Sequence, residues 1–60
     1  MKYAIYFTWG DNEKDSFIVS NAKERDNNIK DMIKRKSFKE ISYCKIYKNG
    51  EYSRRIKVLT

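Results

Sequence analysis

The sequence has no histidine, no proline, one cysteine and two glycines among its 60 residues. A disulfide needs two cysteines, so Cys44 cannot form one within the chain. Without histidine, the chain also lacks most of the ligands that hold zinc in small domains. No residue set forms a catalytic or cofactor motif. We therefore expect no bound metal ion, no cofactor and no enzymatic activity.

Long apolar runs are absent as well. A membrane-spanning helix is indicated by about 18 or more consecutive apolar residues, and no run approaches that length. The N-terminal stretch MKYAIYFTWG alternates between apolar and polar residues and is too short for a signal peptide. Together with a lone cysteine, which suits a reducing compartment, these features predict a soluble cytoplasmic protein that does not contact membranes.

The residues that could carry chemistry lack the partners they need. The Cys44 thiol would need a base to become a thiolate, and only Arg55 is expected nearby, which favours an ordinary packed thiol. Asp11, Glu13 and Asp15 alternate as at the opening of a calcium loop, but the rest of that motif is missing. A polar turn is the simpler interpretation of these carboxylates.

Length and charge limit the remaining possibilities. The chain has no repeat and no flexible linker, which predicts one domain over residues 1–60. A chain this short buries only about 60% of its unfolded surface, so oligomerisation is a common source of added stability. The net charge is +6, from 14 basic and 8 acidic residues. This charge suits a polyanionic partner, although Lys, Asn, Ile and Tyr are also what an AT-rich genome supplies.

A hairpin is predicted around the segment YKNGEY, residues 47–52. Asn-Gly favours a two-residue type I′ turn, with positive φ at both Asn49 and Gly50. The resulting register places four pairs on one sheet face: Tyr47 with Tyr52, Lys45 with Arg54, Tyr43 with Ile56, and Ile41 with Val58. The other face then carries Ser42, Cys44 and Ile46 across from Lys57, Arg55 and Ser53.

The N-terminal part of the chain predicts a second hairpin with a looser turn. The segment KYAIYFTW alternates, and its apolar face consists of Tyr3, Ile5, Phe7 and Trp9. The segment SFIVSN offers Phe17 and Val19 as partners for that face. Pairing Phe7 with Phe17 and Ile5 with Val19 aligns the two apolar faces around a loop at GDNEK.

Between the hairpins, the segment NAKERDNNIKDMIKRK predicts a helix. Asn21 can cap its start, and Glu24 can reach back as in a capping box. The polar run DNN could instead delay the start to Asp26. An apolar stripe at helical spacing consists of Ala22, Ile29, Met32 and Ile33, extended by Phe38.

The order of these elements predicts a ββαββ fold of the α+β class. It is a four-stranded antiparallel sheet with one helix on one face. The face under the helix is expected to carry Ile5, Phe7, Trp9, Phe17, Val19, Tyr43, Ile56 and Val58. The uncovered face is expected to carry Ala4, Tyr6, Ile18, Cys44, Ile46 and Leu59 among polar and basic residues.

This second face is the candidate surface for a partner or for self-association. Its candidate residues are Tyr6, Ile18, Cys44, Ile46, Arg55 and Lys57. A second copy of the chain would bury Tyr6, Ile18 and Ile46 and yield a homodimer. A nucleic acid would stack bases on Tyr6 and place phosphates near Arg55 and Lys57. Scattered surface apolar residues that need no partner are the third interpretation.

The ββαββ pattern across the full chain resembles the small proteins that bacteriophages make to disable bacterial defences or redirect host enzymes. That group includes short inhibitors of the helicase-nuclease system Hachiman. The resemblance implies a non-catalytic binder that occupies a host protein, often as a homo-oligomer. Nucleic-acid mimics among such inhibitors usually use acidic surfaces, whereas this chain is basic. We therefore expect an inhibitor or modulator of a host defence protein, with a basic nucleic-acid-binding protein or small regulator as the alternative.

Overall fold

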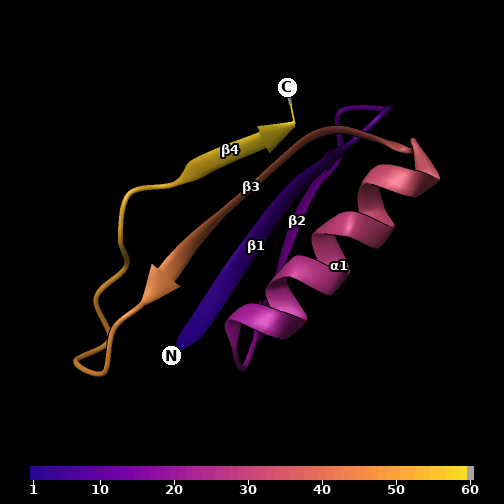
Figure 1. Cartoon of the computed structure of the whole chain (residues 1–60). Coiled ribbons are helices and arrows are strands. Elements are labelled where there is room, and N and C mark those ends of the chain that lie inside the picture. Colours follow the sequence, from indigo (N-terminus) through magenta and orange to yellow (C-terminus); the bar gives the residue numbers. More distant parts are fainter. Residues whose placement is uncertain (60) are drawn as a thin grey trace.

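Two hairpins and one helix follow each other in the predicted order (Figure 1). The computed structural model describes residues 1–59. Its elements are β1 (Lys2–Trp9), β2 (Lys14–Val19), α1 (Ala22–Arg35), β3 (Phe38–Ile46) and β4 (Ile56–Leu59). The strands form one four-stranded sheet in the order β2-β1-β3-β4, and every neighbouring pair is antiparallel. The ββαββ fold of the α+β class is therefore confirmed.

The register of the first hairpin differs from the predicted one. Ile5 lies opposite Phe17 and not opposite Val19, which is a shift of two residues. The cause is the turn, where the Trp9 amide donates to the Glu13 carbonyl at 2.7 Å and closes a shorter loop than GDNEK predicted. Because a shift of two residues keeps every side chain on its face, the apolar alternation is preserved.

The second hairpin has a longer loop than predicted. The Tyr47 amide donates to the Glu51 carbonyl at 2.8 Å, and the Gly50 amide donates to the Tyr47 carbonyl at 2.9 Å. Gly50 has φ of 88°, but Asn49 is not at positive φ, so the predicted type I′ turn is wrong. The Asn49 side chain instead accepts the Glu51 amide at 3.0 Å. This arrangement is a three-residue hairpin loop with glycine at the left-handed position.

The longer loop changes the pairing next to it. Tyr52 forms a bridge with Ile46 and not with Tyr47, which places Tyr52 on the face predicted for Ile46. Lys45 was expected opposite Arg54, but its carbonyl accepts the Ser53 amide at 2.9 Å. Both predicted pairs near the turn are therefore wrong.

The predicted register returns within β4 and is lost again at its end. Tyr43 lies opposite Ile56, as expected. Ile41 lies opposite Leu59 and not Val58, because the register shifts by one residue at a β-bulge. Bulges of this kind cannot be seen in an apolar alternation.

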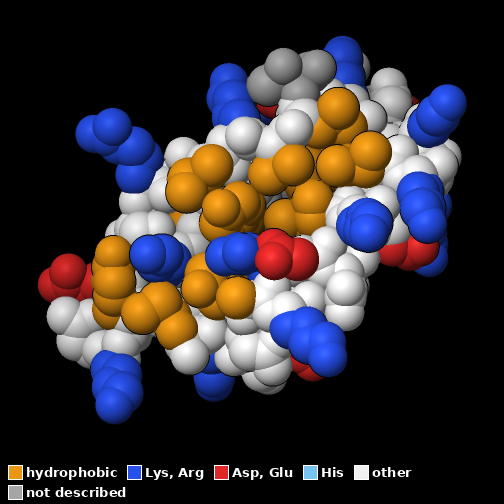
Figure 2. Space-filling view, in the orientation of Figure 1, with side chains coloured by type: hydrophobic (Ala, Val, Ile, Leu, Met, Phe, Trp, Pro, Cys, Tyr) orange, Lys and Arg blue, Asp and Glu red, His pale blue; other side chains and the backbone are white. Residues whose placement is uncertain are grey.

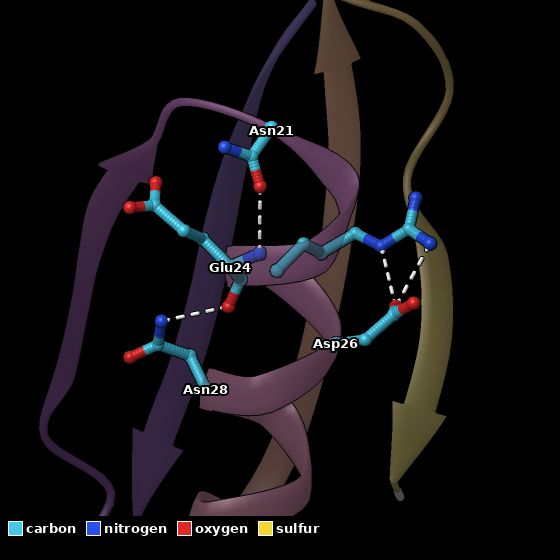
Figure 3. A network of polar contacts seen from close by, with 5 residues as sticks. Asn21, Glu24, Asp26 and Asn28 are labelled. Carbon is cyan, nitrogen blue, oxygen red and sulfur yellow. Dashed lines mark hydrogen bonds and ion pairs between the residues drawn. The ribbon is translucent and has the colours of Figure 1, made fainter.

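Helix α1 begins where the capping residues predict. The Glu24 amide donates to Asn21 Oδ1 at 2.9 Å (Figure 3), and the Ser20 amide donates to the Glu24 carboxylate at 2.9 Å. The alternative start at Asp26 is wrong, since the helix already includes Ala22. Within the polar run, Asn28 donates its side-chain amide to the Glu24 carbonyl at 2.7 Å. These local bonds hold a weak helix-forming segment in the helix.

The core lies between α1 and strands β1 to β3. Its buried residues on this side are Tyr3, Ile5, Val19, Ile29, Met32 and Ile41, with Phe7, Phe17, Phe38, Tyr43 and Leu59 packed around them. Ile56 and Val58 were expected under the helix but are 48% and 39% exposed. Trp9 and Ile33 are also exposed, at 39% and 41%. Figure 1 shows the reason for the exposure of Ile56 and Val58, because α1 lies on the β2 side of the sheet and does not reach β4.

We expect the substitution Gly50→Val to lower the free energy of unfolding by about 1–2 kcal/mol, because a β-branched residue is strained at positive φ. A Cβ at Gly50 would meet no atom within 4 Å, so backbone strain acts alone. Lys48→Val, in the same loop but not at positive φ, is the matched control. Urea denaturation measures both variants, and equal midpoints would contradict this account of the turn.

Candidate binding surfaces

The sheet face opposite α1, called the open face below, holds most of the predicted candidate residues. Cross-strand pairing places Cys44 beside Ala4, and Ser42 between Tyr6 and Lys57. Side chains of directly opposed residues point to the same side of a sheet. The predicted alternation of this face is therefore correct in its centre.

Small residues fill the middle of the open face. Ala4 and Cys44 are 3% and 1% exposed, although no helix covers them. The Cys44 thiol lies 3.8 Å from the Tyr6 hydroxyl oxygen, to which it donates. A thiol this deeply buried, with no base beside it, is a packing residue as the sequence predicted.

Arg55 lies over the ring of Tyr6. Its guanidinium carbon is 3.6 Å from the ring centroid, within the range of a cation–π interaction. Over residues 1–59 the ion pairs are Arg25 with Asp26 and Arg35 with Asp31, so Arg55 has no carboxylate partner there. The ring that was expected to stack bases is thus covered by a guanidinium plane.

A groove of about 540 Å³ runs over this part of the open face. Its lining residues are Tyr6, Phe7, Thr8, Lys14, Asp15, Ser16, Glu40, Ile41, Ser42, Arg55, Lys57 and Leu59. Arg55 and Lys57 supply positive charge beside Ser42, whereas Glu40 lies farther along β3, opposite Thr8. The groove is therefore lined by charged side chains of both signs, with Lys14 and Asp15 of β2 among them.

Two predicted candidates lie outside this groove. Ile18, on the edge strand β2, is 58% exposed. Ile46 is half-buried and lies between Lys2 and Tyr52 at the end of the face that is remote from Glu40. The structure thus brings Tyr6, Cys44 and Arg55 into contact and places Lys57 in their groove, but the predicted apolar centre with Ile18 and Ile46 is separate from it.

The sequence did not predict a second surface, which lies on the helix side of the sheet. We call it the helix-side strip, and it consists of Trp9, Ile33, Phe38, Tyr43, Ile56 and Val58. At one end the rings of Trp9 and Phe38 pack with centroids 4.6 Å apart. Figure 2 shows hydrophobic side chains in a band over the sheet beside the helix. In the sequence, only the number of predicted elements could have indicated this surface, because one helix is too narrow to cover four strands.

Arg25 lies at the border between the helix and this strip. Its guanidinium carbon is 4.6 Å from the Tyr3 ring centroid and 4.7 Å from that of Tyr43. Asp26 pairs with it at 2.8 Å (Figure 3). Burial alone would lower the pKa of Arg25, but the hydrogen bond and charge of Asp26 raise it overall. Arg25 is therefore a neutralised part of the packing.

Basic side chains border the helix-side strip. Lys45 lies opposite Tyr3 and so points to the helix side. Figure 2 shows further Lys and Arg side chains around the hydrophobic band. The strip thus combines an apolar centre with a largely positive border.

Comparison with family models, with curated proteins and with solved structures finds no match to this chain. Within residues 1–59, no group of three or more acidic, cysteine or histidine side chains is placed to hold a metal ion. In the same range, α1 is neither long nor apolar enough to cross a membrane.

We expect Tyr6 to titrate above the ordinary tyrosine pKa of 10.0, because burial disfavours the phenolate and negative charge on the neighbouring Cys44 would add to this effect. Subtracting the ultraviolet titration curve of Tyr6→Phe from that of the native protein isolates this residue. A raised pKa means that the contribution to stability is present below the ordinary pKa and is lost as pH rises through the folded value.

The charge of Arg55 acts in the opposite direction and lowers the Tyr6 pKa. Arg55→Gln should therefore raise the Tyr6 pKa further. A Tyr6 midpoint at or below 10.0 in the native protein would contradict the stacked arrangement of Tyr6, Cys44 and Arg55.

Proposed function

We propose that this chain is a non-catalytic protein-binding module whose contact surface is the helix-side strip. The observation that supports this is the exposure of four large apolar side chains on one side of the molecule: Trp9, Ile33, Ile56 and Val58. Exposed apolar groups that gather in one patch mark interaction surfaces more often than scattered ones do. Burying them against a partner would add the apolar area that a 60-residue core lacks.

The charge of the chain selects the kind of partner. With Lys45 at the border of the strip and a net charge of +6, a complementary protein surface has an apolar centre and an acidic border. Binding of this kind occludes the partner and needs no catalytic group. It fits the function expected from the sequence, which is a phage-derived inhibitor or modulator of a host defence protein that acts in the cytoplasm.

We expect the immobilised native chain to capture an acidic protein from nuclease-treated bacterial lysate. Mass spectrometry identifies this protein, which is then purified for binding measurements. Ile56→Asp should weaken its binding at least about tenfold, because a charge would be desolvated in the contact. Ile18→Asp, at an exposed position on the open face, is the matched control. It alters the dimer contact proposed below but not the helix-side strip, so it should leave capture of the acidic protein intact. Circular dichroism shows that both variants are folded.

Two results would overturn this proposal. If nuclease treatment abolishes capture, the alternative function as a nucleic-acid-binding protein is favoured, with a steep loss of affinity as salt rises. If Ile18→Asp and Ile56→Asp weaken binding equally, the helix-side strip is not the contact surface.

The homodimer expected from the sequence is a further part of this proposal. Ile18, Ile46 and Tyr52 give the open face an apolar end away from the groove, and a second copy would cover it. Light scattering at about 100 μM should show a dimer, since this is well above typical dissociation constants. Ile46→Asp should yield a monomer. A native monomer at that concentration would contradict the dimer.

A further inference from the structure

The groove on the open face has the features of a small-ligand site. Its volume of about 540 Å³ lies within the range of roughly 300–1,000 Å³ that is usual for sites of small molecules and cofactors. Polar groups converge on it from all four strands: Tyr6 and Thr8, Ser16, Ser42 and Glu40, and Lys57. It lies on the sheet face opposite the helix-side strip and is independent of the function proposed there.

Arg55 is held in place without being neutralised. The Tyr6 ring fixes one side of the guanidinium plane at 3.6 Å, and the Cys44 thiol in turn contacts the Tyr6 hydroxyl. Over residues 1–59, the Arg55 side chain donates no hydrogen bond and forms no ion pair. A guanidinium that is already oriented loses little freedom when its donors bind an anion, and its planar fork matches phosphate oxygens.

The groove is also polarised along its length. Lys57, beside Ser42, adds a second cation near Arg55. Glu40 lies two residues along β3 from Ser42, which is about 7 Å at the spacing of an antiparallel strand. Its carboxylate accepts hydrogen bonds from amino groups. Lys14 lies across Thr8 from Glu40, and Asp15 also lines the groove there. Within residues 1–59, the end of the groove with two cations and no carboxylate, at Arg55 and Lys57, is therefore the one that suits a phosphate. The groove therefore suits a ligand with phosphate at one end and hydrogen-bond donors at the other.

We propose that this groove binds a nucleotide, with the phosphate at Arg55 and Lys57 and the amino group of the base toward Glu40. A single nucleotide matches the size of the groove, whereas a continuous polyanion would meet the Glu40 carboxylate.

The test uses the full chain, isotope-labelled, with adenosine monophosphate as the probe and amide chemical shifts as the measurement. We expect saturable shifts at Tyr6, Ser42 and Lys57, and weaker binding of adenosine and of inorganic phosphate separately. Arg55→Gln should weaken binding of adenosine monophosphate at least about tenfold, because a charge-assisted contact is lost. Arg54→Gln removes the same charge from the adjacent residue, which does not line the groove, and should bind normally.

A second variant separates geometry from charge. Arg55→Lys keeps the charge but loses the plane and the fork, so it should also weaken binding. Equal loss in Arg54→Gln and Arg55→Gln, or equal affinity for adenosine monophosphate and inorganic phosphate, would overturn the proposal. If a deoxyadenosine oligomer binds more tightly per nucleotide than adenosine monophosphate does, the groove is the site of a nucleic-acid strand instead.

Discussion

One helix cannot cover a four-stranded sheet, and the rest of this structure follows from that limit. An α-helix is about 10 Å wide, whereas four strands at about 4.8 Å spacing place the outer strand axes about 14 Å apart, before side chains are added. Helix α1 lies over β1, β2 and β3, where it buries Ile29 and Met32 against the sheet. Strand β4 pairs with β3 but receives no helix. Its residues Ile56 and Val58 are therefore left exposed on the helix side.

The open face meets the same shortage of cover in a different way. Its central residues, Ala4 and Cys44, are small enough to be buried by neighbouring side chains. Tyr6 and Arg55 then extend across the sheet, with the ring against the guanidinium. A stacked pair of this kind covers apolar surface while the charged group stays in contact with water. As a result, the helix side carries an apolar strip, and the centre of the open face is a groove lined by charged side chains of both signs.

Local patterns in the sequence were sufficient to predict the elements and their faces. The alternation of β1, the Asn21 cap with Glu24, and the pairing of Tyr43 with Ile56 are all found in the structure. The details of register were not predictable, because turn hydrogen bonds and a bulge decide them. In the first turn, for example, the bond from Trp9 to Glu13 shortens the loop and shifts the pairing by two residues.

The candidate surfaces were predictable only in part, for a related reason. Alternation assigns Tyr6, Arg55 and Lys57 to one face, and the structure places all three around one groove. The same alternation assigned Ile56 and Val58 to the covered face. The direction is correct for Ile56, which lies opposite Tyr43, but the predicted burial is wrong for both residues. How far a helix extends across a sheet depends on its packing angle and side-chain volumes, and neither can be read from a repeat of two residues.

The two arginines that stack on tyrosines show how local charge separates packing from binding. Arg25 lies against Tyr3 and Tyr43 and is paired with Asp26, so its charge is already balanced within the chain. Arg55 lies closer to its ring, yet no carboxylate of residues 1–59 pairs with it. A guanidinium whose hydrogen-bond donors have no partner in the protein gains more from an incoming anion than one that must first give up an ion pair. The same stacking interaction therefore makes Arg25 a structural residue, whereas Arg55 keeps donors that are free within residues 1–59, which is why we propose the ligand site at Arg55.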